Sequence, residues 1–260
     1  MTDREILDII CAAQLEAAEL ILHAHGILAE CKTGHRDVVT EYDRQVQALL
    51  ITRLSDAVPQ ARFYCEESDR QDDLHAETVF IIDPIDGTMN FVRGFHHSCI
   101  SVACMRSGEL RAAAIYNPYA KEHFTALKGA GAWLNARPIH VSDAPLSESV
   151  VCCGTAPYKT ELLDRTFSLM RAVCEASLDI RREGSAALDL CSAASGRAGV
   201  YFELSLSLWD YAAGKLLVEE AGGVCRTVDG AALPLDGSKP TIAAGGRQAV
   251  EDFLALAKRI

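Results

Sequence analysis

The sequence predicts an α/β fold in which helices cover a mixed β-sheet. Its first half shows two amphipathic helix patterns followed by several strand patterns, and its second half alternates strands with helices. No internal repeat, low-complexity tract or linker rich in Pro, Gly or Ser interrupts the chain. We therefore expect residues 1–260 to pack as a single domain, with subdomains of about residues 1–145 and 146–260.

Two helices are expected at the start of the chain. Apolar residues recur at intervals of three and four, which predicts an amphipathic helix over residues 3–30. The polar segment from Lys32 to Asp37 should form a loop. Thr40 and Asp43 then have the spacing of a capping box, which predicts a second helix over residues 41–56.

The periodicity next changes to that of strands, at residues 61–65, 79–82, 98–105, 110–116 and 123–127. Gly108 supplies one of the turns, and this stretch is typical of an antiparallel meander. Pro84 and Gly87 should end the second strand, after which Thr88 to Phe91 should open a helical turn.

The second half predicts a mixed sheet covered by helices. The expected strands are residues 149–153, 177–181, 199–203, 223–228 and 240–244. The expected helices are residues 160–176, 184–196, 209–221 and 246–258.

Composition excludes several classes of protein. Apolar residues make up 49% and charged residues 23%, as in soluble globular proteins. No apolar run reaches the roughly 18 residues of a membrane span, and the acidic, amphipathic start is unlike a signal peptide, so we expect a cytoplasmic protein without a membrane partner. A net charge of -11 argues against a nucleic-acid partner.

The ten cysteines are predicted to be reduced core residues rather than disulfides or zinc ligands. They form no CxxC pair, and most lie within apolar patterns, namely Cys11, Cys99, Cys104, Cys174 and Cys191.

The segment from Ile81 to Phe91 ends an apolar strand with two carboxylates and a hydroxyl in one turn. The oxygens of Asp83 and Asp86 suit Mg²⁺, and free amides at the start of the helical turn, near Thr88, would favour phosphate. An Asp-rich turn without a ligand is the alternative for this motif by itself.

Further acids stand at the ends of other elements. Glu66-Glu67-Ser68 follows a strand, and Asp210 opens a helix. Taken singly, each of them is better explained as a surface charge or a cap, and Asp210 as an acid of a first helical turn.

Together these residues resemble the signature of the inositol monophosphatase family, whose metal-dependent enzymes hydrolyse phosphomonoesters of inositol, sugars and nucleotides. The resemblance spans nearly the whole chain. Its parts occur in family order: Asp37 to Asp43, Glu66 to Ser68, Asp83 to Phe91, Gly129 to Asn135, Gly184 to Ala187, Glu203, Trp209 to Gly214 and Glu220 to Gly223. The resemblance implies a layered αβαβα sandwich of the inositol monophosphatase/fructose-1,6-bisphosphatase type and a homodimer.

The resemblance also implies a set of metal ligands. Glu66, Asp83 and the main-chain carbonyl of Ile85 would bind a first Mg²⁺, and Asp83, Asp86 and Asp210 a second. A third, weaker ion would bind Glu66. Electrostatics supports bound metal ions independently of the resemblance. Two carboxylates about 4 Å apart repel by roughly 4 kcal/mol at an effective dielectric constant near 20, and a divalent cation between them turns this repulsion into binding.

For catalysis, the resemblance implies that the Thr88 hydroxyl, paired with Asp43, orients and helps to deprotonate a metal-bound water. Glu66 shares in catalysis through its metal ion. The water would attack phosphorus in line with the departing alkoxide, without a phosphoenzyme. Considered without the resemblance, Asp43 is better explained as a capping or surface acid in the first turn of the second helix.

The implied substrate contacts are Asp86, Gly87, Thr88, Gly184, Ser185, Ala186, Glu203 and Asp210. The amides of Gly87 and Thr88 would hold phosphate oxygens, while Glu203 and residues 184–186 would border the alcohol half. A strand-end charge is the alternative for Glu203. Lys32 resembles a mobile active-site lysine, with a solvated surface lysine as the alternative.

Three positions depart from the commonest family pattern. Cys65 replaces a glycine before the two glutamates, which could alter the local backbone. Met89 fills a variable slot. Glu183 stands where an apolar residue usually precedes Gly184, so it adds negative charge beside the alcohol pocket and bears on substrate preference.

The expected function is Mg²⁺-dependent, Li⁺-sensitive hydrolysis of a phosphomonoester, with inositol monophosphate as the leading substrate. Another sugar phosphate, fructose 1,6-bisphosphate, histidinol phosphate and 3'-phosphoadenosine nucleotides are alternatives. A haloacid-dehalogenase phosphatase would need a motif one residue shorter than the segment from Asp83 to Thr88. A regulatory interaction protein contacting transcription machinery is the alternative from another class.

Overall fold

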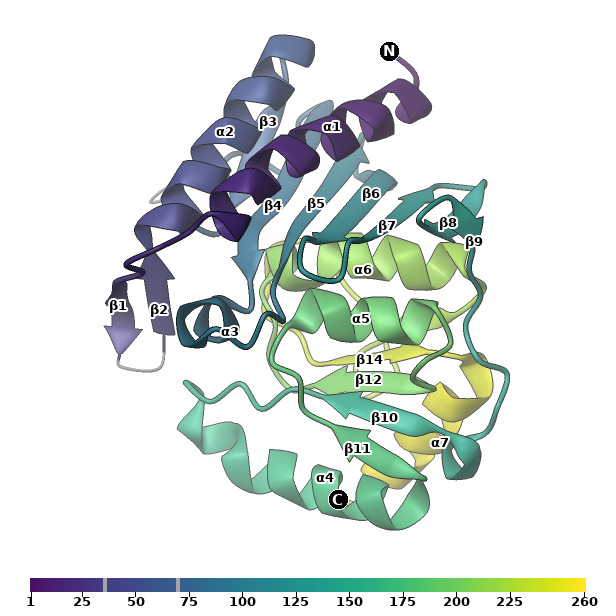
Figure 1. Ribbon diagram of the computed structural model, residues 1–260. Helices are drawn as coiled ribbons and strands as arrows, with labels where there is room; N and C mark the ends of the chain where they lie inside the picture. The colour runs from purple at the N-terminus through teal and green to yellow at the C-terminus, as the bar shows by residue number, and fades with distance from the viewer. Residues whose placement is uncertain (35–36, 69–70) are drawn as a thin grey trace.

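Five layers, alternately helical and sheet, make up the fold (Figure 1). The computed structural model describes residues 1–34, 37–68 and 71–260. The first layer holds two helices, α1 (Asp3–Leu22) and α2 (Glu41–Ala57). They cover a seven-stranded sheet with the strand order β3 (Arg62–Cys65), β4 (Thr78–Asp86), β5 (Cys99–Arg106), β6 (Glu109–Asn117), β7 (Glu122–Leu127), β8 (Gly131–Leu134) and β9 (Arg137–Pro138).

The remaining layers come from the second half of the chain. Two helices, α5 (Ala186–Ala194) and α6 (Leu208–Glu220), lie between the sheets. The second sheet has the strand order β11 (Asp179–Arg181), β10 (Val150–Cys153), β12 (Val200–Glu203), β14 (Ile242–Gly245) and β13 (Val224–Arg226). The last layer holds α4 (Leu163–Ala176) and α7 (Arg247–Ala257). The predicted αβαβα sandwich is confirmed.

Short elements complete the chain. They are the hairpin β1 (Ala29–Gly34) and β2 (Asp37–Thr40), the helix α3 (Thr88–Arg93) and two 3₁₀ turns, η1 (Leu146–Glu148) and η2 (Thr160–Leu162).

Strand alternation divides the apolar side chains of the described residues among three cores, and the central one joins the α5–α6 layer to both sheets. In β4, Val79 and Ile81 face the α5–α6 layer, whereas Phe80 and Ile82 face α1 and α2. A third core lies between the second sheet and the last layer of helices. Because α6 packs against the first sheet, the two halves of the chain share the central core.

The start of the chain differs from the sequence prediction. The helix expected over residues 3–30 ends at Leu22, because Gly26 adopts a left-handed φ of 58° and Ala29 begins β1. The loop expected from Lys32 to Asp37 is instead part of the β1–β2 hairpin, apart from residues 35 and 36, which lie outside the described residues. The capping box of Thr40 and Asp43 is confirmed.

The first sheet is not a pure antiparallel meander. Strand β3 pairs in parallel with β4, and the antiparallel pairing begins only between β4 and β5. The sequence of a strand does not reveal which strand it pairs with, so the parallel pairing of β3 with β4 could not be predicted from the sequence. Strand β4 also continues past Pro84 to Asp86, and β8 and β9 were not predicted.

The alternation of strands and helices in the second half is confirmed, although α4 begins only after the 3₁₀ turn η2. All ten cysteines are free thiols. Cys174 is exposed, contrary to the prediction that it belongs to the core. Among the described residues, no helix has both the length and the apolar character needed to cross a membrane.

Candidate active site

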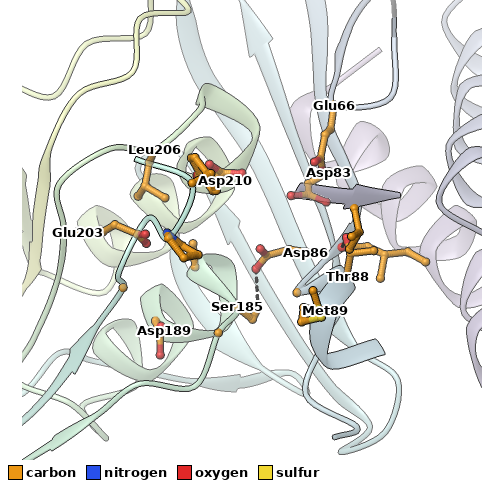
Figure 2. A pocket seen from close by; sticks show the side chains of 18 of the residues that line it. Glu66, Asp83, Asp86, Thr88, Met89, Ser185, Asp189, Glu203, Leu206 and Asp210 are labelled. Carbon is orange, nitrogen blue, oxygen red and sulfur yellow. Dashed lines mark hydrogen bonds between the residues drawn. The ribbon is translucent and has the colours of Figure 1, made fainter. Parts of the chain in front are cut away.

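A cavity of about 190 Å³ opens where β4, α3, α5 and α6 meet the end of β12 (Figure 2). Its lining includes six acidic residues: Glu66, Asp83, Asp86, Asp189, Glu203 and Asp210. The first half of the chain supplies three of them and the second half the other three, so the site depends on the packing of both halves.

A bulge in β4 aims two acids at this cavity. Asp83 is opposite Ser101 and Asp86 is opposite Cys99, so three residues of β4 match two of β5. Residues three apart in a regular strand would face opposite sides of the sheet. The extra residue therefore brings Asp83 and Asp86 to the same face.

Asp83 lies among three other acids. Its side chain is buried, and Oδ1 has no hydrogen-bond partner. Burial, followed by the charges of Glu66, Asp86 and Asp210, raises the pKa of Asp83 well above its usual range. A buried, unpartnered carboxyl oxygen among other acids is a fitting ligand for a cation.

Asp86 is held from the second half of the chain. Its Oδ2 accepts hydrogen bonds from the Ser185 hydroxyl and, at 2.8 Å, from the Ala187 amide. Burial nevertheless raises the pKa of Asp86. Because Ser185 is buried and bonded to Asp86, its position is that of a residue that orients this acid.

Asp210 combines two roles that seemed to be alternatives. Its Oδ2 accepts the Ser207 amide at 2.7 Å, so it caps the first turn of α6. It also lines the cavity, where burial and the charges of Glu66 and Asp86 raise its pKa well above the usual range.

Glu66 is paired with a lysine from the β1–β2 hairpin. The Lys32 ammonium lies 2.8 Å from Glu66 Oε1 and also contacts Glu67. Although burial opposes the charged form of the lysine, these two carboxylates raise the pKa of Lys32. The lysine is therefore ion-paired with an acid of the cavity lining, although the residue as a whole is exposed.

Within the described parts of the chain, no three His, Cys, Asp or Glu side chains are already gathered as a metal-holding group. Carboxylates that repel one another are expected to close around an ion as it binds. The oxygen donors of Glu66, Asp83, Asp86 and Asp210, with the Ile85 carbonyl, fit the preference of Mg²⁺.

Thr88 and Asp43 come together as expected. The Thr88 hydroxyl lies 3.3 Å from Asp43 Oδ1 and 3.0 Å from the Ile85 carbonyl. Asp43 also accepts hydrogen bonds from the amide and hydroxyl of Thr40, so it is both a capping acid and a neighbour of Thr88. Its complete burial raises the pKa of Asp43 to about 6.

Glu203 ends β12 at the other end of the cavity. Its Oε1 accepts the Ala156 amide at 2.8 Å, and its Oε2 accepts the Tyr201 hydroxyl at 2.7 Å. Burial raises the pKa of Glu203. Gly154 lies against this carboxyl group and leaves room for it.

The glycine-rich segments fix the approach of the two halves. Gly87 has a φ of 86°, and a Cβ there would lie 3.0 Å from the His97 carbonyl and 3.3 Å from the Gly184 carbonyl. The Asn90 amide donates to the carbonyls of His97 and Glu183, both at 2.8 Å. Gly87, Gly184 and Ala186 all line the cavity.

The three unusual positions have simple local settings. The Glu183 carboxylate lies 3.2 Å from His97 Nε2, outside the cavity lining. Cys65 is buried at the end of β3, where its backbone exchanges hydrogen bonds with the side chain of Gln71. Met89 lines the cavity and is 40% exposed.

Sequence reasoning missed two charged residues of the cavity, Asp189 and Arg182, besides several uncharged ones. One signal was available, because Asp189 interrupts the apolar sequence of α5. Arg182 lies in an exposed polar stretch and carried no such signal.

This fold and this site define a layered α/β protein with a carboxylate-lined cavity of the kind that holds divalent ions. The profile of the inositol monophosphatase family matches residues 2–260. The Nus factor SuhB of Xylella fastidiosa is 39% identical over 226 residues, which cover 86% of this chain and 82% of the relative.

Solved structures agree. The extragenic suppressor protein suhB from Bartonella henselae superposes with a TM-score of 0.91 at 30% identity, covering 98% of this chain and 99% of that one. Inositol monophosphatase from Anabaena (Nostoc) sp. gives a TM-score of 0.87 at 30% identity, covering 99% and 96%. The chain belongs to the inositol monophosphatase family, not to the haloacid-dehalogenase phosphatases.

Proposed function

We propose that this protein is a Mg²⁺-dependent phosphomonoesterase that hydrolyses inositol monophosphate. One observation carries the proposal. The unpartnered Oδ1 of Asp83 is buried in the field of Glu66, Asp86 and Asp210, an arrangement that a divalent cation stabilises. The family membership and the likeness to the Anabaena inositol monophosphatase support it.

The acids would hold two or three Mg²⁺ ions. Glu66, Asp83 and the Ile85 carbonyl would bind one ion, Asp83, Asp86 and Asp210 a second, and Glu66 a third. When bound, such ions supply a water of lowered pKa and stabilise the charge that develops on phosphate. Ser185 and Ala187 keep one oxygen of Asp86 occupied, which fixes the direction of the other.

Thr88 and Asp43 would manage the proton of the attacking water. The Thr88 hydroxyl can donate its proton to a hydrogen bond with Asp43 Oδ1, which leaves the lone pairs of the Thr88 oxygen free to accept a hydrogen bond from the water. Thr40 holds the other oxygen of Asp43, so the acid has little freedom to turn. This pair would orient the water and accept its proton.

The phosphate and the alcohol would occupy different ends of the cavity. The amides of Gly87 and Thr88, at the start of α3, would donate to phosphate oxygens. Asp210 and residues 184–186 would flank the ester, and Glu203 would face the alcohol half.

The test is phosphate release from myo-inositol 1-phosphate, fructose 1,6-bisphosphate, histidinol phosphate and 3'-phosphoadenosine 5'-phosphate. Mg²⁺ would be titrated, with EDTA as the control and Li⁺ as an expected inhibitor. We expect turnover that requires Mg²⁺ and favours the inositol ester. A preference for another ester would correct the substrate, and no turnover by folded protein with bound metal would overturn the proposal.

The names of the relatives favour a second candidate function. Several relatives of 33% to 39% identity are called Nus factor SuhB, which supports a regulatory protein that contacts transcription machinery. Co-purification with RNA polymerase that persists in a Thr88→Ala variant would support this role. Absence of association at low salt would exclude it.

Two further parts of the proposal rest on the family resemblance and on composition. We propose a homodimer in the cytoplasm, without a nucleic-acid or membrane partner. Sedimentation of the purified protein would test the dimer, and a monomer at micromolar concentration would contradict it.

A further inference from the structure

The cavity divides into two acidic groups on either side of Asp86 (Figure 2). Glu66 and Asp83 belong to the group proposed to hold metal. On the other side lie Asp189 and Glu203. Arg182, whose charge acts on Glu203, carries the one cationic group among the described residues that line the cavity.

Asp189 has an oxygen that the protein leaves without a partner. The residue is 1% exposed, and its Oδ1 makes no hydrogen bond. The neighbouring thiol of Cys152, a weak donor, only slightly offsets the rise in the pKa of this carboxyl group. A buried polar atom without a partner costs about 1–3 kcal/mol, so its persistence beside a cavity needs a reason.

Glu203 is different, because protein groups already occupy both of its oxygens. The Ala156 amide and the Tyr201 hydroxyl fix this carboxyl in one orientation. Asp189 therefore has the larger unused hydrogen-bonding capacity of the two. Burial, followed by the charges of Glu183 and Glu203, raises the pKa of Asp189 well above its usual range, so it can also donate a proton to a hydrogen bond.

We propose that Asp189 is a specificity-determining residue that hydrogen-bonds a hydroxyl group on the alcohol half of the substrate. The site would then select phosphate esters of polyols over esters of plain alcohols. This inference rests on the proposed function. A phosphate held beside Asp83 and Asp86 would leave the alcohol half in the part of the cavity that Asp189 and Glu203 line, where a hydroxyl near the ester would supply the missing partner.

The experiment compares two esters that differ only in hydroxyl groups, myo-inositol 1-phosphate and cyclohexyl phosphate. We expect Asp189→Ala to lower kcat/KM for the inositol ester by about 10- to 100-fold, mainly through KM, and to change the cyclohexyl ester by less than about twofold. Asp189→Asn keeps hydrogen-bonding groups of the same shape and should retain most of the preference. Glu175→Gln, on the exposed face of α4, is the matched control and should change neither ester.

A stability measurement separates this role from a structural one. Since its Oδ1 has no partner, Asp189→Asn should unfold at the same temperature as the wild type or at a higher one. A variant that loses stability and loses activity equally on both esters would show a structural role and overturn the inference, as would an unchanged ratio of the two kcat/KM values in Asp189→Ala. Wild-type protein that hydrolyses both esters equally would overturn it while leaving the phosphatase function intact. Failure to hydrolyse either ester with Mg²⁺ would overturn the proposed function and this inference together.

Discussion

Replacing Gly154 with alanine would show how firmly the alcohol end of the cavity is fixed. A Cβ at this position would lie 1.9 Å from Oε2, 2.1 Å from Cδ and 2.6 Å from Oε1 of Glu203. Gly154 does not have a left-handed backbone. The effect of the substitution should therefore come from the contact with Glu203 rather than from backbone strain.

The size of the effect follows from the hydrogen bonds of Glu203. An ordinary van der Waals contact begins near 3.4 Å, so the carboxyl group must move by about 1.5 Å. It would then lose the Ala156 amide and the Tyr201 hydroxyl as partners. Two buried hydrogen bonds of about 1–2 kcal/mol each give an expected loss of about 2–4 kcal/mol in the free energy of unfolding.

A double-mutant cycle with Glu203→Ala is the assay. Urea unfolding would be followed by tryptophan fluorescence for the wild type, both single variants and the double variant. In the Glu203→Ala background the added methyl group meets no carboxyl, so it should cost less than about 0.5 kcal/mol and leave a coupling energy of about 2 kcal/mol or more. Equal losses in both backgrounds would refute the reasoning.

Three further predictions concern other parts of the molecule. Asp210→Asn should reduce kcat by about 100-fold or more at saturating Mg²⁺, because it removes the charge of a proposed metal ligand. The circular dichroism spectrum should stay native, because the side-chain carbonyl oxygen of asparagine can still accept a hydrogen bond from the Ser207 amide. Near-normal turnover would contradict this prediction. Lys32→Met should tighten Mg²⁺ binding by up to about fivefold in calorimetry, because the lysine would no longer compete with the metal for Glu66 and a partly exposed ion pair contributes up to about 1 kcal/mol. Unchanged affinity would show that the ion pair does not compete with the metal. Burial lowers the pKa of His123 to about 4, so its contribution to the free energy of unfolding should be complete above pH 6.5 and should fall by up to about 3 kcal/mol as pH drops through 4. His123→Gln, which cannot titrate, should flatten this pH dependence. An equally steep curve for the variant would assign the dependence to other groups.

The sequence alone determined those features that depend on neighbouring residues. The capping box of Thr40 and Asp43, the apolar periodicities and the alternation of elements in the second half are local patterns, and the structure contains them. The motif from Asp83 to Thr88 likewise predicted that Asp83 and Asp86 share a site, and it is one of the segments that pointed to the family. Local spacing was enough because these side chains act within one turn of chain.

Tertiary structure decided whatever depends on residues far apart in the chain. The parallel pairing of β3 with β4 is one example, because a strand sequence does not name its partner. The hydrogen bond from Ser185 to Asp86 spans 99 residues, and it gives a residue that was predicted as a substrate contact the further role of orienting an acid. The lack of a hydrogen-bond partner for Asp189 Oδ1 is also a property of the packed molecule, because burial removes water from this atom and no protein group takes the place of the water.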